Sequence, residues 1–240
     1  MVLGIDVGSL YSKGVLFDGE IRKKVVVKTS YRPREAIAEI KRELWGYNLI
    51  AATGYGRELV TDAHRTITEI SAFARGAAYI DRTVRTIIDI GGQDSKVIKL
   101  KDGALDRFVM NDRCAAGTGN FIEKMAQALD LTLEEFGALA LKSGRPEPID
   151  SLCVVMAETE ILSLVSEGKR IEDIIFGICD SLIRRIIGIS GQIGIEDPVL
   201  FCGGGALNPG LVKALEHNLH SVMQSPIPQY VGALGAALSI

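Results

Sequence analysis

Two cysteines in this sequence lie in settings that suit metal binding. Cys114 lies in a run of small residues, 111–119, and a helical pattern of apolar residues starts directly after that run. Thr118 is the expected N-cap of this helix, so Cys114 would lie near free backbone N–H groups and the positive end of the helix dipole, which favour a thiolate. Cys153 also precedes a long helical pattern. Two thiolates are half of a four-cysteine cluster site, which two chains related by a dyad could complete; the alternative is a pair of ordinary reduced cysteines in tight loops.

The other candidate ligands have different surroundings. Cys179 falls inside an apolar helical pattern and Cys202 ends an apolar strand, so both are expected in the core. Glu158 and Glu160 follow Cys153 on the expected helix and are interpreted as solvated side chains, of which Glu158 could also contact a partner. The histidines show no metal-ligand spacing: His64, His217 and His220.

Composition and charge exclude several classes of protein. The chain has 240 residues, of which 47% are hydrophobic and 24% charged, as is ordinary for a globular α/β protein. The net charge is −3 and no long basic run is present, so nucleic acid is not an expected partner. No apolar run reaches membrane-spanning length and no signal peptide is recognisable, so we expect a cytoplasmic protein with no membrane contact. In a reducing compartment the four cysteines are thiols or metal ligands.

The second half of the chain repeats a pattern from the first. Residues 88–98, Ile-Asp-Ile-Gly-Gly-Gln-Asp-Ser-Lys-Val-Ile, align without a gap with residues 5–15. The coinciding pairs are Asp6 with Asp89, Gly8 with Gly91, Ser12 with Ser95 and Lys13 with Lys96. Each copy has the pattern of an apolar strand, a short turn and a returning strand, and an Asp-Gly hairpin signal follows each copy at nearly the same offset. This internal repeat predicts two similar lobes.

The repeated turn is suited to binding phosphate. Glycines at positions 8, 91 and 92 leave backbone N–H groups accessible, with no Cβ to block a phosphate oxygen. Asp6 and Asp89 stand at strand ends, where a carboxylate can hold Mg²⁺ directly or through its waters. A third glycine-rich turn, 203–205, follows the expected strand 199–202. The sequence has no P-loop pattern, and Leu59 occupies the third glycine position of a dinucleotide-binding fingerprint.

Apolar periodicity predicts the remaining elements. Strands are expected at 2–8, 13–17, 21–28, 49–52, 88–90 and 199–202. Helices are expected at 33–44, around 71–78, from 119, at 133–142, through 161–165, at 171–189, from 209 and at 230–237. The small residues of the last helix predict that it crosses the helix around 72–78 at close range.

These motifs resemble a known superfamily. Paired Asp-x-Gly hairpins, a late Gly-Gly-Gly and small-residue helices are similar to actin, hsp70 and the sugar kinases. Within that group, Asn-Asp-Arg-Cys-Ala-Ala-Gly-Thr-Gly at 111–119 and Cys-Val-Val-Met-Ala-Glu-Thr-Glu at 153–160 closely resemble the ATPase activators (component A) of 2-hydroxyacyl-CoA dehydratases and the related ATPase subunits of benzoyl-CoA reductase. The likeness spans essentially the whole chain.

The resemblance implies a fold and a function. The expected fold is α/β, with two ribonuclease H-like, actin-like lobes and a nucleotide in the cleft between them: residues 1–83 plus 227–240, and residues 84–226. The implied function is an ATPase that transfers a low-potential electron to a two-subunit iron–sulfur dehydratase or reductase. The implied cofactors are ATP, Mg²⁺ and one [4Fe–4S] cluster shared across a homodimer through Cys114 and Cys153 of each subunit, and the implied electron donor is a ferredoxin or flavodoxin.

By analogy with related ATPases, roles are assigned to individual residues. Gln93 and Asp94 are expected to position the attacking water, because they follow the second glycine turn. The catalytic assignment comprises Asp6, Asp89, Gln93 and Asp94. The nucleotide-binding assignment comprises Gly8, Ser9, Ser12, Lys13, Gly91, Gly92, Gly203, Gly204, Gly205 and Asn208.

The sequence departs from the family pattern at three positions. Leu10 replaces a hydroxyl residue, and Ala72-Phe73 replaces a Cys-His pair. The segment Thr53–Arg57 matches a family pattern, and its chemistry leaves it open whether it is more than a tight turn after a strand.

Two alternative functions remain: a small-molecule kinase of the same superfamily, which leaves Cys114 and Cys153 unexplained, and a nucleotide-binding redox sensor.

Overall fold

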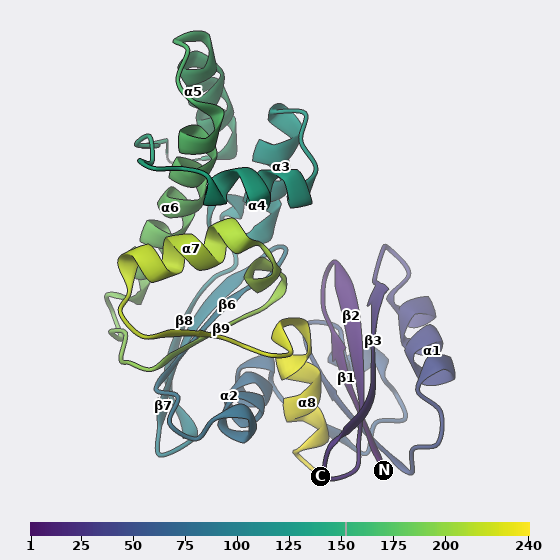
Figure 1. Cartoon of the computed structure of the whole chain (residues 1–240). Coiled ribbons are helices and arrows are strands. Elements are labelled where there is room, and N and C mark those ends of the chain that lie inside the picture. Colours follow the sequence, from purple (N-terminus) through teal and green to yellow (C-terminus); the bar gives the residue numbers. More distant parts are fainter. Residues whose placement is uncertain (152) are drawn as a thin grey trace. The chain divides into compact units, whose positions relative to one another are not determined.

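A computed structural model describes residues 1–151 and 153–240 of the chain (Figure 1). The chain divides into two compact units. The first comprises Met1–Ile87, Ile98–Phe108 and Ser225–Ile240, and the second comprises Ile88–Val97 and Val109–Gln224. The expected lobes, residues 1–83 plus 227–240 and residues 84–226, stay a prediction.

The first sheet has five strands in the order β3-β2-β1-β4-β5. Its strands are β1 (Val2–Val7), β2 (Tyr11–Phe17), β3 (Ile21–Lys28), β4 (Leu49–Thr53) and β5 (Arg65–Thr66). The central strand β1 runs antiparallel to β2 and parallel to β4, and this register pairs Asp6 with Lys13 on one side and with Thr53 on the other. The sheet therefore places three polar residues side by side where β1 ends.

Helix α1 (Pro33–Glu43) covers part of this sheet. Pro33 stands in the first turn, where its missing N–H costs nothing. Ile37, Ile40 and Leu44 are buried and pack in one cluster with residues of β1, as the apolar spacing predicted.

The second sheet also has five strands, in the order β10-β9-β6-β7-β8. Its strands are β6 (Thr86–Ile90), β7 (Ser95–Lys101), β8 (Ala104–Asn111), β9 (Val199–Cys202) and β10 (Val222–Gln224). Taken from its opposite edge, the second sheet begins β8-β7-β6-β9, and these four strands correspond to β3-β2-β1-β4 of the first sheet. The internal repeat predicted from the sequence is thereby confirmed at the level of topology.

Helices α2 (Glu69–Ile80) and α8 (Val231–Ala237) cross at close range (Figure 1). A Cβ on Gly76 would overlap the carbonyl oxygen of Val231, and a Cβ on Gly235 would overlap that of Ala72. The crossing predicted from small residues is therefore confirmed. Ala72 is fully buried there and the ring of Phe73 packs near Gly232, so these two departures from the family pattern occupy an apolar contact.

The remaining helices build the second unit. They are α3 (Gly119–Ala128), α4 (Leu133–Leu141), α5 (Val154–Ser166), α6 (Ile171–Ser190) and α7 (Pro209–Asn218). Helix α6 is buried on most of its faces and forms the middle of the core. Cys179 on α6 and Cys202 at the end of β9 are both fully buried, which confirms their predicted core positions. Within the described residues, no helix combines the length and the hydropathy needed to cross a bilayer.

Candidate functional site

The first repeated turn, Gly8–Leu10, connects β1 to β2 and is called here the first glycine turn. Asp6 lies just before it and is 3% exposed. Nζ of Lys13 lies 3.9 Å from Oδ2 of Asp6, and the Lys13 side chain keeps about a fifth of its surface open to solvent. A phosphate at this turn would meet the Lys13 ammonium group and backbone N–H groups, and the Asp6 carboxylate, which pairs with Lys13, would offer oxygen ligands to a divalent cation.

The hydroxyl groups of Thr29 and Ser12 stabilise the first glycine turn by hydrogen bonds. Oγ1 of Thr29 donates a hydrogen bond of 2.8 Å to the carbonyl oxygen of Gly8, and it lies 2.9 Å from Oγ of Ser12. Because Thr29 already donates to Gly8, the Ser12 hydroxyl acts as the donor to Thr29. The carbonyl of Leu10 also accepts a hydrogen bond, of 2.9 Å, from the Thr29 N–H. Ser12 is fully buried and Ser9 is exposed, so of the two assigned serines it is Ser9 that faces solvent.

The segment Thr53–Arg57 closes against Asp6. Gly54 has a φ of +88°, and a Cβ on it would lie 2.5 Å from Oδ1 of Asp6. Gly232 approaches the other carboxylate oxygen, since its Cβ would lie 3.0 Å from Oδ2. Thr53 is fully buried beside Asp6 in the sheet, and its Oγ1 has no hydrogen-bond partner among the described residues. The segment Thr53–Arg57 therefore has a structural role: its Gly54, with Gly232 on the other side, lets the backbone confine the Asp6 carboxylate.

The second repeated turn, Gly91–Asp94, connects β6 to β7 and is called here the second glycine turn. Lys96 is 1% exposed, and its Nζ lies 3.2 Å from Oδ2 of Asp89 and 2.8 Å from Oδ2 of Asp94. The Gly91 N–H donates a 2.9 Å hydrogen bond to the carbonyl of Asp94, which tightens the turn. Gln93 projects from the tip as an exposed residue. Two carboxylates share one buried ammonium here, so this turn is more acidic than the first.

The third glycine-rich segment repeats the contact made by Gly54. Gly203 has a φ of +85°, and its Cβ position meets Oδ1 of Asp89. Gly205 packs against Ile90, as Gly56 packs against Val7. The pattern Gly-x-Gly follows β4 and again β9, and this repeat in the sequence is the pattern from which the matching contacts could have been predicted.

Asn208 has a clear local role. It is the N-cap of α7, and its Oδ1 accepts hydrogen bonds from the N–H groups of Gly210 and Leu211 at 2.9 and 3.3 Å. Its assignment to nucleotide binding stays a prediction, as do those of Gln93 and Asp94. The first glycine turn brings Lys13 into contact with Asp6. The second brings Lys96 into contact with Asp89 and Asp94.

The two cysteines singled out in the sequence are the accessible ones. Cys114 is exposed, and Cys153 is half-buried at the N-cap of α5, where no side chain caps the helix. Burial raises the pKa of both the Cys179 and the Cys202 thiols, which keeps them protonated. Thr118 is the N-cap residue of α3 as expected, but its hydroxyl donates to the carbonyl of Ala115 and does not cap the helix.

Neither cysteine belongs to a complete metal site. Among the residues that the structure describes, no three His, Cys, Asp or Glu side chains are grouped so as to hold a metal ion. The chemistry of the two accessible thiols suits iron and sulfide, and a single chain offers two of the four thiolates that a cluster needs. The thiols thus fit half of a shared cluster site.

Glu160 was interpreted as a solvated side chain, and this interpretation is wrong. Its Oε1 accepts a 3.1 Å hydrogen bond from the Asp150 N–H, and its Oε2 accepts a 3.0 Å hydrogen bond from the Ser151 N–H. Burial raises the pKa of Glu160, but hydrogen bonds from the Ser151 side chain and from both N–H groups outweigh that effect and lower it overall. Glu158 is exposed, as expected.

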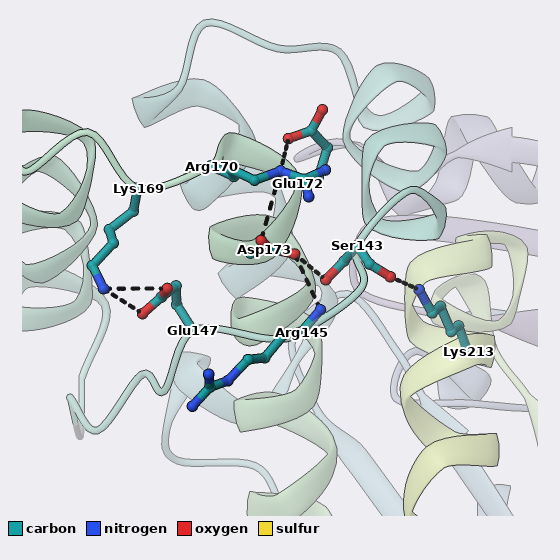
Figure 2. Close-up of polar contacts among 8 residues, drawn as sticks. All are labelled: Ser143, Arg145, Glu147, Lys169, Arg170, Glu172, Asp173 and Lys213. Atoms are coloured by element: carbon teal, nitrogen blue, oxygen red, sulfur yellow. Dashed lines mark hydrogen bonds and ion pairs between the residues drawn. The ribbon is translucent and has the colours of Figure 1, made fainter.

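The segment that leads to Cys153 is fixed by the polar network in Figure 2. Oδ1 of Asp173, in the first turn of α6, accepts hydrogen bonds from Oγ of Ser143 at 2.7 Å and from the Arg145 N–H at 3.3 Å. Nζ of Lys213 donates to the carbonyl of Ser143 at 2.9 Å, and Lys169 pairs with Glu147 at 3.3 Å. No local sequence pattern predicts this network, because its partners lie far apart in the chain.

Comparison with known proteins gives a consistent result. The sequence matches the BadF/BadG/BcrA/BcrD ATPase family over residues 3–239. It is 44% identical over 249 residues to the activator of lactoyl-CoA dehydratase of Anaerotignum propionicum, covering 98% of this chain and 95% of that protein.

Two solved structures are similar throughout. The first is the (R)-2-hydroxyglutaryl-CoA dehydratase component A of Acidaminococcus fermentans, with a TM-score of 0.92, 41% identity and coverage of 99% of this chain and 96% of that one. The second is the activator of the 2-hydroxyisocaproyl-CoA dehydratase of Clostridium difficile with bound ADPNP, with a TM-score of 0.91, 38% identity and coverage of 99% and 93%. The chain belongs to the BadF/BadG/BcrA/BcrD ATPase family.

Proposed function

We propose that this protein hydrolyses ATP and uses the energy to transfer a low-potential electron to a partner enzyme, a 2-hydroxyacyl-CoA dehydratase or a benzoyl-CoA reductase-like enzyme. The observation that carries the proposal is the combination, in one chain, of two Asp–Gly turns with two accessible cysteines at helix starts. The names of the relatives support the same activity. A small-molecule kinase would leave both cysteines without a role.

The two glycine turns and their aspartates bind the phosphates of ATP and its Mg²⁺. Asp6 and Asp89 hold the cation or its waters, since buried carboxylate oxygens are the ligands that Mg²⁺ prefers. Lys13 neutralises phosphate charge at the first turn, where about a fifth of its side chain is exposed. Gln93 and Asp94 orient the attacking water at the second turn. Phosphoryl transfer depends on positioning and charge neutralisation, which these residues supply.

Cys114 and Cys153 hold one [4Fe–4S] cluster together with the same cysteines of a second copy of the chain. Bound there, such a cluster would supply one-electron chemistry at low potential. The N–H groups at the start of α5 stabilise the negative charge of a Cys153 thiolate, because Cys153 is the N-cap residue and makes no side-chain capping hydrogen bond of its own. A ferredoxin or flavodoxin supplies the electron, and a two-subunit iron–sulfur dehydratase or reductase accepts it.

The test combines colour, metal content and turnover. Protein purified without oxygen should be brown, with about four iron and four sulfide per two chains. ATP hydrolysis should rise when a reduced donor and a candidate partner dehydratase are both present. Colourless, iron-free protein that phosphorylates a small molecule would establish the kinase alternative. A cluster without appreciable ATP turnover in the presence of the partner would favour the redox sensor.

A further inference from the structure

The loop that carries Cys114 is held by the side chain at its start. This loop, residues 111–118, is called here the Cys114 loop. Nδ2 of Asn111 donates a 2.7 Å hydrogen bond to the carbonyl of Cys114, and the Cys114 N–H donates a 3.2 Å hydrogen bond to Oδ1 of Asn111. The amide of Asn111 therefore fixes the backbone of Cys114 on both sides.

The segment that carries Cys153 is held by a different residue. Asp150, Ser151 and Cys153 are called here the Cys153 loop. Both carboxylate oxygens of Glu160, two turns along α5, accept hydrogen bonds from backbone N–H groups of this loop. The two cysteine loops thus have separate local supports.

Arg185 of α6 contacts both loops. Its Nη2 donates a 3.1 Å hydrogen bond to the carbonyl of Ser151 in the Cys153 loop. Its stem lies against the Cys114 loop, because a Cβ on Gly117 would sit 3.6 Å from Cδ of Arg185 and 2.5 Å from Nδ2 of Asn111. A side chain at position 117 would collide with the Asn111 amide, whereas it would be in ordinary contact with the Arg185 stem. One side chain therefore touches two segments that lie more than thirty residues apart in the sequence.

The Cys114 loop is also bonded to the second glycine turn. At the start of α3, directly after this loop, the N–H groups of Gly119 and Asn120 donate to the carbonyls of Gly91 and Gly92 at 2.8 and 2.9 Å. A change in the backbone of this turn must either break these two hydrogen bonds or move the start of α3 with it. The contacts thus run without a gap from the glycine turn to the Cys114 loop, then to Arg185 and the Cys153 loop.

We propose that Arg185 is a positioning residue that carries a conformational change at the second glycine turn from the Cys114 loop to the Cys153 loop. This inference rests on the function proposed above, because it gives the nucleotide a route to both thiols of one chain. Each loop alone has a support that would let it move independently. The guanidinium–carbonyl bond and the packing on Gly117 make them move as one.

The test is amide hydrogen exchange of the full-length protein with ADP and with a non-hydrolysable ATP analogue. In the wild type, exchange in both loops should differ between the two nucleotides by about fivefold or more, the lower end of typical coupling between sites. In Arg185→Met, which keeps an unbranched stem against Gly117 but removes the donor, the Cys114 loop should still respond. The N–H groups of Asp150 and Ser151 should respond no longer. Their basal exchange should rise roughly 10- to 150-fold, the effect of losing one hydrogen bond from a charged donor.

Arg184→Met is the matched control. Arg184 is the neighbouring residue, but it is exposed and pairs with Asp180 at 3.3 Å on its own helix. Its replacement should leave the nucleotide response of both loops intact. Glu160→Gln is a second variant that weakens the Cys153 loop without touching Arg185, so it should raise basal exchange while the response persists. The proposal is wrong if the Cys153 loop of Arg185→Met responds as in the wild type, if Arg184→Met abolishes the response equally, or if the wild type responds in one loop alone.

Failure of the inference and failure of the proposed function give different results. Iron and sulfide are counted in the same preparations after anaerobic reconstitution. Wild-type protein that takes up no iron would refute the cluster, whatever the exchange data show. Iron-loaded wild type whose Cys153 loop ignores Arg185 would refute the inference alone.

Discussion

Gly54 and Asp6 lie in direct contact, such that a methyl group on Gly54 would sit 2.5 Å from Oδ1 of Asp6. Gly203 makes the same contact with Asp89. Both glycines have a positive φ, of +88° and +85°, at the end of the strand next to the aspartate. The duplicated unit therefore includes a glycine that confines the carboxylate as well as the aspartate itself.

Gly54→Ala should lower ATP hydrolysis by roughly 10- to 100-fold, since displacing a reacting group by about 1 Å can cost 100-fold. The added methyl group must displace both the Asp6 carboxylate and the Val7 carbonyl, which would lie 2.5 and 2.6 Å from it. Left-handed backbone also costs an alanine about 1–2 kcal/mol, so the free energy of unfolding should fall as well. Steady-state ATPase assays and denaturant unfolding of the same variant measure the two effects.

Gly19→Ala separates these two effects. Gly19 has a φ of +76°, and a Cβ there would meet nothing within 4 Å. This variant should lose only the stability that the left-handed backbone costs an alanine, which is less than Gly54→Ala loses, and keep its turnover. If both variants retain normal turnover, the confinement of Asp6 has no part in catalysis.

The paired hairpins could be predicted from the sequence because their signals are local. Asp6 and Lys13 are register partners in one hairpin, and the repeat at Asp89 and Lys96 has the same spacing. The contact between Gly54 and Asp6 joins residues that are distant in sequence, so it became visible only in the folded sheet. The strands β5 and β10, of two and three residues, are too short to show a period of two, and they were missed.

The supports of the cysteine loops were unpredictable for a different reason. Helix periodicity distinguishes the buried face of α5 from its exposed face, but both Glu158 and Glu160 lie off the buried face. Which carboxylate turns back to bind a loop depends on where that loop runs. Asp173 on α6 holds the segment before the loop at Ser143, Arg185 on the same helix bonds the loop itself at Ser151, and no local pattern links these residues to Cys153.

Asp6→Asn and Asp89→Asn should each reduce ATP hydrolysis by roughly 10²- to 10³-fold, as expected when one electrostatic contribution to the transition state is lost. An amide has the shape of the carboxylate but cannot neutralise Mg²⁺. Neither variant removes a thiol, so iron content should stay at the wild-type value. Unchanged turnover in both variants would place the nucleotide site elsewhere.

Cys114→Ala and Cys153→Ala should each abolish cluster assembly, because a shared site would keep two of its four thiolates. Cys179→Ala and Cys202→Ala should retain it, since both thiols are fully buried in the core. Iron and sulfide are counted per two chains in all four variants. A complete cluster in Cys114→Ala would contradict the shared site.

Asp173 should make the free energy of unfolding of the second unit depend on pH in the acidic range. The hydrogen bond from Ser143 lowers its pKa below the ordinary 3.8; burial opposes this, while the Arg145 N–H and the charge of Arg170 add to it. Because the folded pKa lies below the unfolded one, the ionised carboxylate stabilises the fold. That contribution is complete above the ordinary pKa and is lost as the pH falls through the folded value.

Asp173→Asn should therefore be less stable than the wild type by about 1.5–3 kcal/mol at pH 7, the range for hydrogen bonds to a charged group. The difference should be constant at pH values above the ordinary pKa of 3.8 and should shrink as the pH falls below it towards the lowered pKa of the folded state. Free energies of unfolding in urea at a series of pH values measure it. Asp106→Asn is the control, because Asp106 is exposed on β8 and its replacement should change stability little at any pH. A difference for Asp173→Asn that persists unchanged at pH 3 would show that the network of Figure 2 does not depend on the charge of Asp173.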